Sequence, residues 1–183
     1  AAKDTEGEML FYQSKVCEGV FHRISSGTTR DGLEVFGKME KGYLLSVDSN
    51  WDMYGDGYLS GHYFSEGALR EQLEKAYPGL VFTEEPVENQ INMYKRDKVG
   101  HILFLTVGNK TISGEEFRQL LELPSSNFTM QAADGKIRFL CKGQGHGLGL
   151  SQYGGNVLAK EGKSYKEILR YYFPECGVQK KDS

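Results

Sequence analysis

Residues 143–155 read GQGHGLGLSQYGG, and six of the chain's 23 glycines fall within these thirteen positions. The stretch follows an apolar segment that ends at Cys141 and precedes a helical pattern that begins near Ser151. Glycine adopts positive φ freely and lets a ligand or another backbone segment come close. The order therefore predicts a strand, a glycine turn and a helix, with His146 uncrowded between two glycines. Composition alone leaves ligand contact and a plain turn equally open.

The glycine stretch does not fit the known nucleotide-binding motifs. A dinucleotide fingerprint that began at Gly143 would place Leu148 at the third glycine, and one that began at Gly145 would place Leu150 there. The Lys-Ser/Thr pair of a P-loop is also missing, because Leu150 and Ser151 follow Gly149. A net charge of -3 argues against a general nucleic-acid binder. No apolar run approaches the roughly 20 residues of a membrane span.

The patterns around this stretch predict an α+β fold, with mixed or antiparallel strands, hairpins and several short helices, in a single domain over residues 1–183. Strands are expected at 8–12, 16–22, 43–47, 91–94, 102–107, 128–131 and 137–141. Helices are expected at 65–77, from 113 onward, at 151–160 and at 164–172. Ser65 and Ser113 are the expected N-caps, and Asp134-Gly135 is the expected hairpin turn. Residues 51–58 are expected to be a loop.

The chain has three cysteines, so at least one thiol has no partner within the chain, and a disulfide scaffold is not expected. Cys17 and His22 lie five positions apart, but zinc needs three or four ligands. The third ligand would be His146, Cys141 or water. The alternative is a buried thiol and a hydrogen-bonded core histidine, and the residues alone favour this alternative.

Other polar and aromatic side chains carry weaker signals. His62 and His101 have no partner motif and are expected at the surface or in turns. Aromatic residues between Trp51 and Tyr63 stand beside carboxylates, a combination that suits sugar rings and equally suits a loop clamp. No Ser-His-Asp triad is assigned, because none of the serines has the setting of a nucleophile elbow.

Residues 143–155 resemble the GxGHGxGxSQxGA signature of the stage II sporulation protein D family, which includes an amidase enhancer. Gly155 stands where the family commonly has Ala. Residues 159–173 are similar to the family's tail, which ends in a Tyr-Tyr pair, and residues 113–128 are similar to its SGxExRxxLgLxSsxF stretch. Residues 4–8 and 20–29 are similar to its DTxGxvL…FHsxsGGxT run, with Ser26 in place of a glycine. The resemblance covers nearly the whole chain.

The resemblance implies a peptidoglycan lytic transglycosylase of spore engulfment, which cleaves glycan strands stripped of stem peptides. In this family a glutamate serves as general acid/base, and the sugar's 6-hydroxyl closes an anhydro ring. The family's glutamate lies upstream of the DTxGxvL run, so no catalytic residue is assigned here, and neither Glu6 nor Glu8 is given that role. Because the chain starts at Ala1-Ala2, we expect an N-terminally truncated domain that is inactive alone.

The resemblance also implies a set of site residues. A glycan groove is expected to be lined by His22, Ser25, Thr29, Tyr94, Lys95, His146, Ser151, Gln152 and Tyr153. Zinc is the implied cofactor, with Cys17 and His22 as ligands.

The expected partners are peptidoglycan glycan strands and an amidase or endopeptidase of the engulfment machinery, with no nucleic acid and no transmembrane segment in this chain. The expected location is extracytoplasmic, associated with the cell wall or membrane on the mother-cell side of the sporulation septum. The alternative to the enzyme is a non-catalytic amidase enhancer or cell-wall-binding scaffold module. A glutamate in the upstream segment would favour the enzyme.

Overall fold

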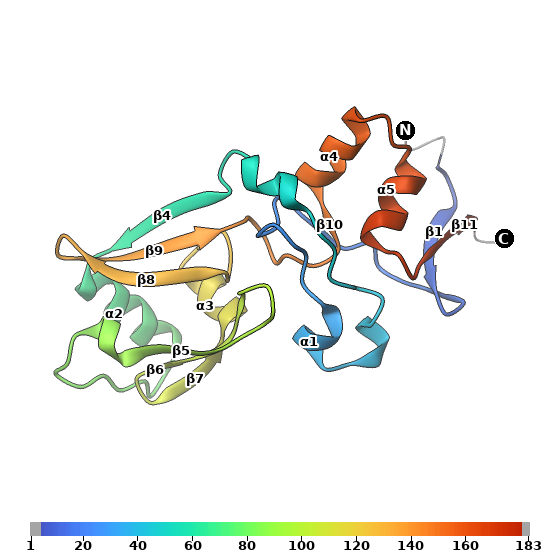
Figure 1. The fold of residues 1–183 in the computed structure, drawn as a ribbon. Helices are drawn as coiled ribbons and strands as arrows, with labels where there is room; N and C mark the ends of the chain where they lie inside the picture. The colour runs from blue at the N-terminus through green and yellow to red at the C-terminus, as the bar shows by residue number, and fades with distance from the viewer. Residues whose placement is uncertain (1–4, 181–183) are drawn as a thin grey trace.

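The computed structural model describes residues 5–180, so Asp4, which begins the DTxGxvL-like run, lies outside the described residues. The expected α+β class is confirmed. Figure 1 shows an elongated molecule with two lobes. We call residues 59–142 the inserted lobe, and residues 5–58 with 143–180 the terminal lobe. Each lobe has its own cluster of buried apolar side chains.

The inserted lobe contains two antiparallel sheets and two helices, which share one core. One sheet has the order β4-β9-β8, from β4 (Leu59–Phe64), β9 (Lys136–Lys142) and β8 (Phe128–Ala133). The other has the order β5-β6-β7, from β5 (Ile91–Arg96), β6 (Ile102–Val107) and β7 (Lys110–Ser113). The helices are α2 (Glu66–Ala76) and α3 (Gly114–Leu120), with a 3-10 turn, η3, at Val87–Gln90.

Local capping and turn chemistry explain why these elements form where the sequence predicts them. The Ser65 side chain accepts a hydrogen bond from the Ala68 amide at the start of α2. Ser113 and Glu116 form a complete capping box at the start of α3. The turn between β8 and β9 places Asp134 at φ 52° and Gly135 at φ 72°, the conformation that an Asp-Gly hairpin turn requires.

The terminal lobe is built from both ends of the chain. Its sheet has the order β11-β1-β2, from β11 (Gly177–Lys180), β1 (Glu8–Tyr12) and β2 (Lys15–Val16). A short parallel pair joins β3 (Phe21–His22) to β10 (Leu150–Ser151). The helices are α1 (Gly32–Phe36), α4 (Gln152–Lys160) and α5 (Tyr165–Tyr172), with 3-10 turns η1 (Met39–Lys41) and η2 (Asn50–Tyr54).

Three expected elements of the terminal lobe differ from the structure. The expected strand 16–22 is broken, because Val16 pairs with β1 whereas Phe21 and His22 pair with β10. The expected strand 43–47 does not form, and the Val47 amide donates to the Thr29 hydroxyl instead. The expected loop 51–58 begins within η2. In the first two cases a contact with a distant segment replaces the local pattern, whereas η2 is held by local hydrogen bonds such as that from the Gly55 amide to the Asp52 carbonyl.

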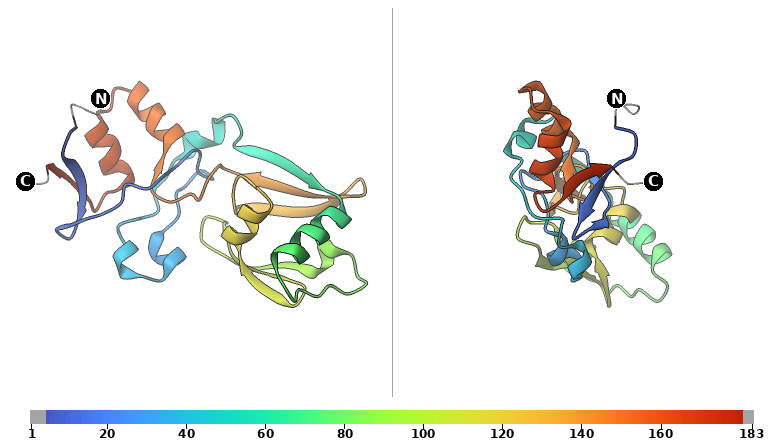
Figure 2. Two further views of the ribbon diagram at one scale, coloured as in Figure 1. Left: turned by 180° about the vertical axis from the view of Figure 1, so that it is seen from behind. Right: turned by 90° about the vertical axis from the view of Figure 1, so that its right-hand side faces the viewer.

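The chain passes between the lobes twice, and the two crossings lie side by side (Figure 2). The Gly143 amide donates to the Tyr58 carbonyl over 2.7 Å. Tyr58 is the residue before β4, and Gly143 is the residue after β9. The Gly145 amide donates to the Pro124 carbonyl of the inserted lobe over 2.7 Å. The glycine stretch therefore begins at the junction between the lobes.

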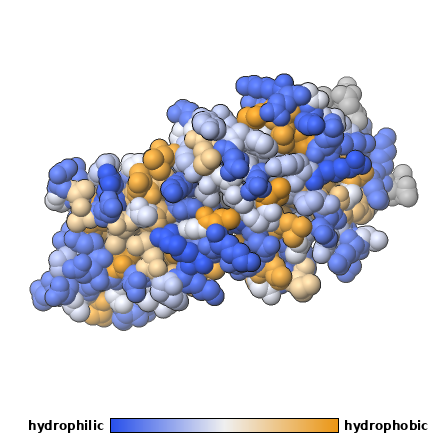
Figure 3. All heavy atoms as spheres, in the orientation of Figure 1, coloured by the Kyte–Doolittle hydropathy of each residue, from blue (hydrophilic) through white to orange (hydrophobic). Residues whose placement is uncertain are grey.

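Hydrophobic groups are scattered among hydrophilic ones over the face in Figure 3. Among the described residues no helix has the length and apolar character that crossing a membrane requires.

Candidate functional site

The glycine loop, residues 143–149, needs glycine at alternate positions. Gly143, Gly145, Gly147 and Gly149 all have positive φ, between 67° and 105°. A Cβ at Gly145 would lie 2.8 Å from the Cβ of His22, and one at Gly149 would collide with the Val20 carbonyl. The glycines are therefore required by both the turn and the close approach of residues 20–22.

Hydrogen bonds hold this loop against residues 20–30. The Gln144 carbonyl accepts from the Arg23 and Ile24 amides, both over 3.1 Å, and the Gln144 amide donates to the Ile24 carbonyl over 2.7 Å. The Arg30 amide donates to the Gly147 carbonyl over 2.8 Å. Two motifs more than a hundred positions apart in the sequence thus pack against each other.

Three histidines gather at the loop, and we call His22, His101 and His146 the histidine cluster. The His22 and His146 rings lie 5.8 Å apart between centroids. A Cβ at Gly147 would lie 3.0 Å from His101 Nε2, so the His101 ring lies against the loop. His101 is 1% exposed and so does not lie at the surface, but it ends the turn that begins at Asp97, which is the other position expected for it. The turn that buries it is closed by Asp97, whose carboxylate accepts from the His101 amide over 2.8 Å.

The cluster is electrically neutral near pH 7. Burial lowers the pKa of His22 to about 4 and the pKa of His101 well below its ordinary value. The pKa of His146 is lowered as well, because burial outweighs the opposing effect of the nearby Glu115 carboxylate. His22 Nδ1 lies 3.0 Å from the Leu148 carbonyl, which only accepts, so Nδ1 carries the proton. His22 Nε2 is therefore a buried acceptor, and within residues 5–180 it has no hydrogen-bond partner.

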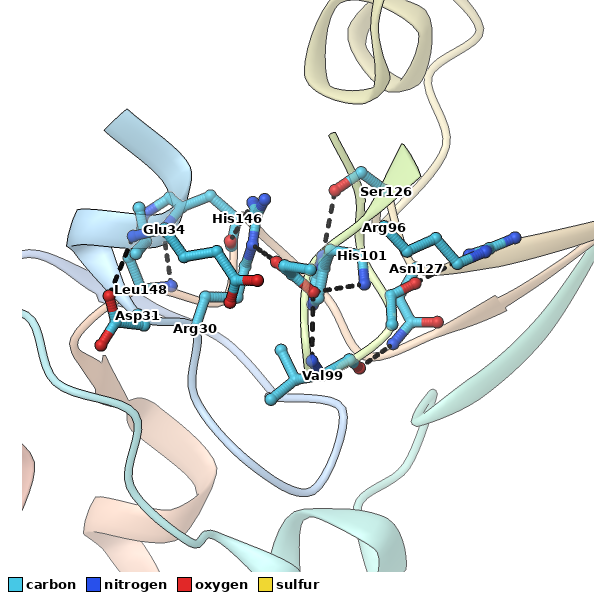
Figure 4. A network of polar contacts seen from close by, with 12 residues as sticks. Arg30, Asp31, Glu34, Arg96, Val99, His101, Ser126, Asn127, His146 and Leu148 are labelled. Carbon is cyan, nitrogen blue, oxygen red and sulfur yellow. Dashed lines mark hydrogen bonds and ion pairs between the residues drawn. The ribbon is translucent and has the colours of Figure 1, made fainter. Parts of the chain in front are cut away.

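A buried ion pair joins the two lobes beside the cluster. Arg30 Nε lies 2.6 Å from Asp97 Oδ2, and the two side chains are 4% and 1% exposed. Arg30 Nη1 also donates to the His146 carbonyl over 3.1 Å. Figure 4 shows Arg30, Glu34 and His146 of the terminal lobe facing His101 of the inserted lobe. The ion pair fixes the glycine loop to the inserted lobe.

A cleft of about 390 Å³ opens where the lobes meet, and we call it the interlobe cleft. The terminal lobe contributes His146 and Glu34, and the inserted lobe contributes Lys95, Glu115 and Phe104. Glu115 Oε1 accepts from Arg118, whereas Glu115 Oε2 is buried without a hydrogen-bond partner among the described residues. The cleft thus offers both charges and apolar walls to a ligand.

Comparisons with known proteins connect the whole chain to one group. No family model matches the chain. Over its full length the chain is 31% identical to stage II sporulation protein D of Bacillus amyloliquefaciens and 28% identical to the protein of that name from Bacillus subtilis (strain 168). The similarity to stage II sporulation protein D therefore runs along the whole chain. It spans about half, 51%, of the length of these two curated relatives.

A second similarity covers less of the chain. Over 88 residues, which are 48% of this chain and 12% of the relative, it is 32% identical to the amidase enhancer of Bacillus subtilis (strain 168).

Of the groove residues implied by the family resemblance, His146 and Lys95 line the interlobe cleft. Gln152 and Tyr153 line a separate hollow beside Arg23. Tyr94 is exposed on β5.

The other four groove residues are buried, and each is engaged within the fold: His22, Ser25, Thr29 and Ser151. The Ser25 amide donates to the buried Asp52 carboxylate over 2.7 Å, and the Ser151 hydroxyl accepts from the Gly154 amide as the N-cap of α4. These four residues therefore hold the local structure around the glycine loop and do not line the cleft.

The sequence reasoning missed four residues that shape the cleft or its junction: Arg30, Asp97, His101 and Glu115. Three of them come from the inserted lobe and meet the glycine loop only after folding. For Glu115 the signal was its place next to the capping box, which indicated only a helix start. Nothing in the local pattern distinguished Asp97 or His101 from ordinary turn residues.

The residues implied as zinc ligands do not form a complete site. Cys17 Sγ faces Cys176 Sγ at 3.6 Å, while His22 Nδ1 is engaged with the Leu148 carbonyl. Within residues 5–180 no three side chains of the His, Cys, Asp or Glu type gather to hold a metal ion. Because zinc requires three or four ligands, this donor set does not fit the metal, and we derive no chemical step through it.

Proposed function

We propose that this chain is the glycan-holding part of a sporulation protein that acts on peptidoglycan as a lytic transglycosylase. The observation that carries the proposal is the interlobe cleft, in which His146 of the family signature faces polar groups of the inserted lobe. The similarity to stage II sporulation protein D along the whole chain supports the sporulation role. The proposed location is extracytoplasmic, on the mother-cell side of the septum.

The cleft suits a chain of amino sugars. Its volume of about 390 Å³ is within the usual range of small-ligand sites. The Phe104 and Phe36 rings supply apolar surface for sugar ring faces, and Lys95 and Glu34 supply groups for hydroxyls and N-acetyl amides. The Glu115 carboxylate adds an acidic group to the wall that the inserted lobe contributes.

The reaction itself needs a carboxylic acid that protonates the glycosidic oxygen while the 6-hydroxyl attacks the anomeric carbon. We propose that a glutamate from outside this chain supplies this acid, as the family resemblance implies. This chain's own residues hold and orient the strand. The neutral histidine cluster adds no charge to the cleft. The charged groups that line it are Glu18, Glu34, Lys41, Lys95 and Glu115, beside the paired Arg30.

The second candidate is a non-catalytic module that binds glycan and stimulates a partner amidase. The 88-residue similarity to the amidase enhancer of Bacillus subtilis favours it. Incubation of the full-length protein with denuded glycan strands separates the two candidates. The enzyme releases anhydro-muramyl products, whereas the module releases none and instead raises the rate of an added amidase.

Binding by the chain itself is tested with chito-oligosaccharides and isothermal titration calorimetry. We expect His146→Ala and Lys95→Ala each to weaken binding about tenfold, because each removes roughly one directed contact of about 1.4 kcal/mol. His62→Ala and Lys136→Ala are the matched controls, since neither residue lines the cleft. Equal affinities for all four variants and the original chain would contradict the assignment of the cleft.

The family resemblance implies zinc at Cys17 and His22, whereas the described residues supply no complete donor set there. Elemental analysis of the purified protein decides it, and an occupancy below about a tenth of an equivalent removes the prediction.

A further inference from the structure

The thiols of Cys17 and Cys176 face each other although they are 159 positions apart, with their sulfur atoms 3.6 Å from each other. They flank the central strand of the terminal sheet. Phe11 of β1 pairs with Val16 on one side and Gly177 on the other, and each cysteine is the next residue beyond its strand. The fold thus places the segment after β2 and the segment before β11 next to each other, although they come from opposite ends of the sequence.

The surroundings of the pair are apolar. Both cysteines belong to the apolar cluster of the terminal lobe, in which Leu10 and Tyr43 are also packed. Cys17 is partly exposed and Cys176 is 7% exposed, so an oxidant reaches Cys17 first. Burial raises the pKa of Cys17 and raises that of Cys176 to about 12. Thiolate is therefore scarce at neutral pH, and reaction with an oxidant is slow.

We propose that Cys17 and Cys176 form a disulfide bond when a small-molecule disulfide is present as the oxidant. The Cys17 thiolate attacks one sulfur of the oxidant and releases its other half as a thiol. The Cys176 thiolate then attacks the Cys17 sulfur of this mixed disulfide and releases the second thiol. The two cysteines lose two hydrogen atoms in total, and the oxidant gains them.

The bond requires the sulfur atoms to move from 3.6 Å to about 2.05 Å. The Cys17 amide donates to the Leu10 carbonyl of β1 and the Cys176 amide donates to the Phe173 carbonyl, both over 2.9 Å, so the sulfur atoms approach by rotation of the two side chains. The closed loop spans 159 positions, a long loop whose closure removes much freedom from the unfolded chain. The bond would also fix the segment that leads from Cys17 to His22 and the glycine loop.

The test uses the 183-residue chain incubated with oxidised glutathione, and a parallel sample kept in dithiothreitol. Intact-mass spectrometry should show the loss of two hydrogen atoms, and a non-reducing digest should link the Cys17 peptide to the Cys176 peptide. The oxidised chain should melt about 5–15 °C higher than the reduced chain. The digest reads the bond in the unaltered chain, so the result does not depend on any variant folding.

Three variants control the assignment. Cys17→Ser and Cys176→Ser should each lose the cross-link, whereas Cys141→Ala should keep it, because Cys141 is buried in the core of the other lobe. A stable glutathione adduct on Cys17 without a cross-link would overturn the proposal. Unmodified thiols after prolonged oxidation, with or without bound zinc, would overturn it as well.

Discussion

Single residues at the junction between the lobes make contacts that their local sequence does not indicate. Arg30 and Asp97 come from different lobes and form an ion pair with almost no exposure. Asp97 also accepts hydrogen bonds from the Val99 and His101 amides. Removal of one partner from such a pair leaves a buried charge without compensation. These residues therefore hold both the lobes and the histidine cluster in place.

We predict that Asp97→Ala lowers the free energy of unfolding by about 3–5 kcal/mol, because the Arg30 guanidinium then stays buried and unpaired. Urea unfolding followed by circular dichroism measures the change. Glu18→Ala is the control, since Glu18 pairs with Lys41 at the surface and such pairs contribute at most about 1 kcal/mol. Similar losses in the two variants would show that burial of the Arg30–Asp97 pair is not what matters.

At the scale of elements, helices α2 to α5 follow from local sequence, whereas the short helix α1 and several strands were not expected from it. Helix α5 begins at a capping box made by Ser164 and Glu167, and all of its signals lie within a few residues. The segment 16–22 carries the alternation of a strand, yet its two ends pair with different strands. A strand exists only where a partner strand lies beside it, and the partner of Phe21–His22 is over a hundred residues away.

Helix α4 depends on a glycine at its first turn. A Cβ at Gly154 would collide with the Tyr172 hydroxyl and the Trp51 indole nitrogen. We predict that Gly154→Ala lowers the free energy of unfolding by about 1–3 kcal/mol, as overpacking of a dense region does.

Gly67 in α2 is the matched control for this prediction, because a Cβ there meets nothing within 4 Å. Gly67→Ala should raise stability by about 0.5–1 kcal/mol, since alanine is the better helix former. Both variants are measured by thermal unfolding. A stabilising effect of Gly154→Ala would contradict the close packing of α4 against η2.

At the scale of the whole molecule, the buried histidines make stability depend on pH. The pKa of His22 falls from 6.5 in the unfolded chain to about 4 in the folded protein. Protons therefore bind the unfolded state first, and the stability present above pH 6.5 is lost as the pH falls toward 4. The lowered pKa values of His101 and His146 act in the same direction.

We predict that His22 alone removes about 2 kcal/mol of unfolding free energy between pH 7.5 and pH 5.0. Urea unfolding at the two pH values measures this difference. His22→Asn cannot gain the proton, so the variant should show a smaller pH dependence than the original chain. An unchanged dependence in the variant would assign the effect to other groups.

The sequence by itself determined the α+β class, the helices α2 to α5, the Asp-Gly hairpin and the resemblance to the stage II sporulation protein D family, because all of these depend on short motifs. The tertiary structure alone decided which residues meet at the interlobe cleft. His101, Asp97 and Glu115 reach the glycine loop only because residues 59–142 fold as a lobe inserted between two halves of the other. The Cys17–Cys176 contact likewise arises from pairing of the two chain ends around β1. Contacts between distant segments leave no local pattern, and so they could not be read from the chain before folding.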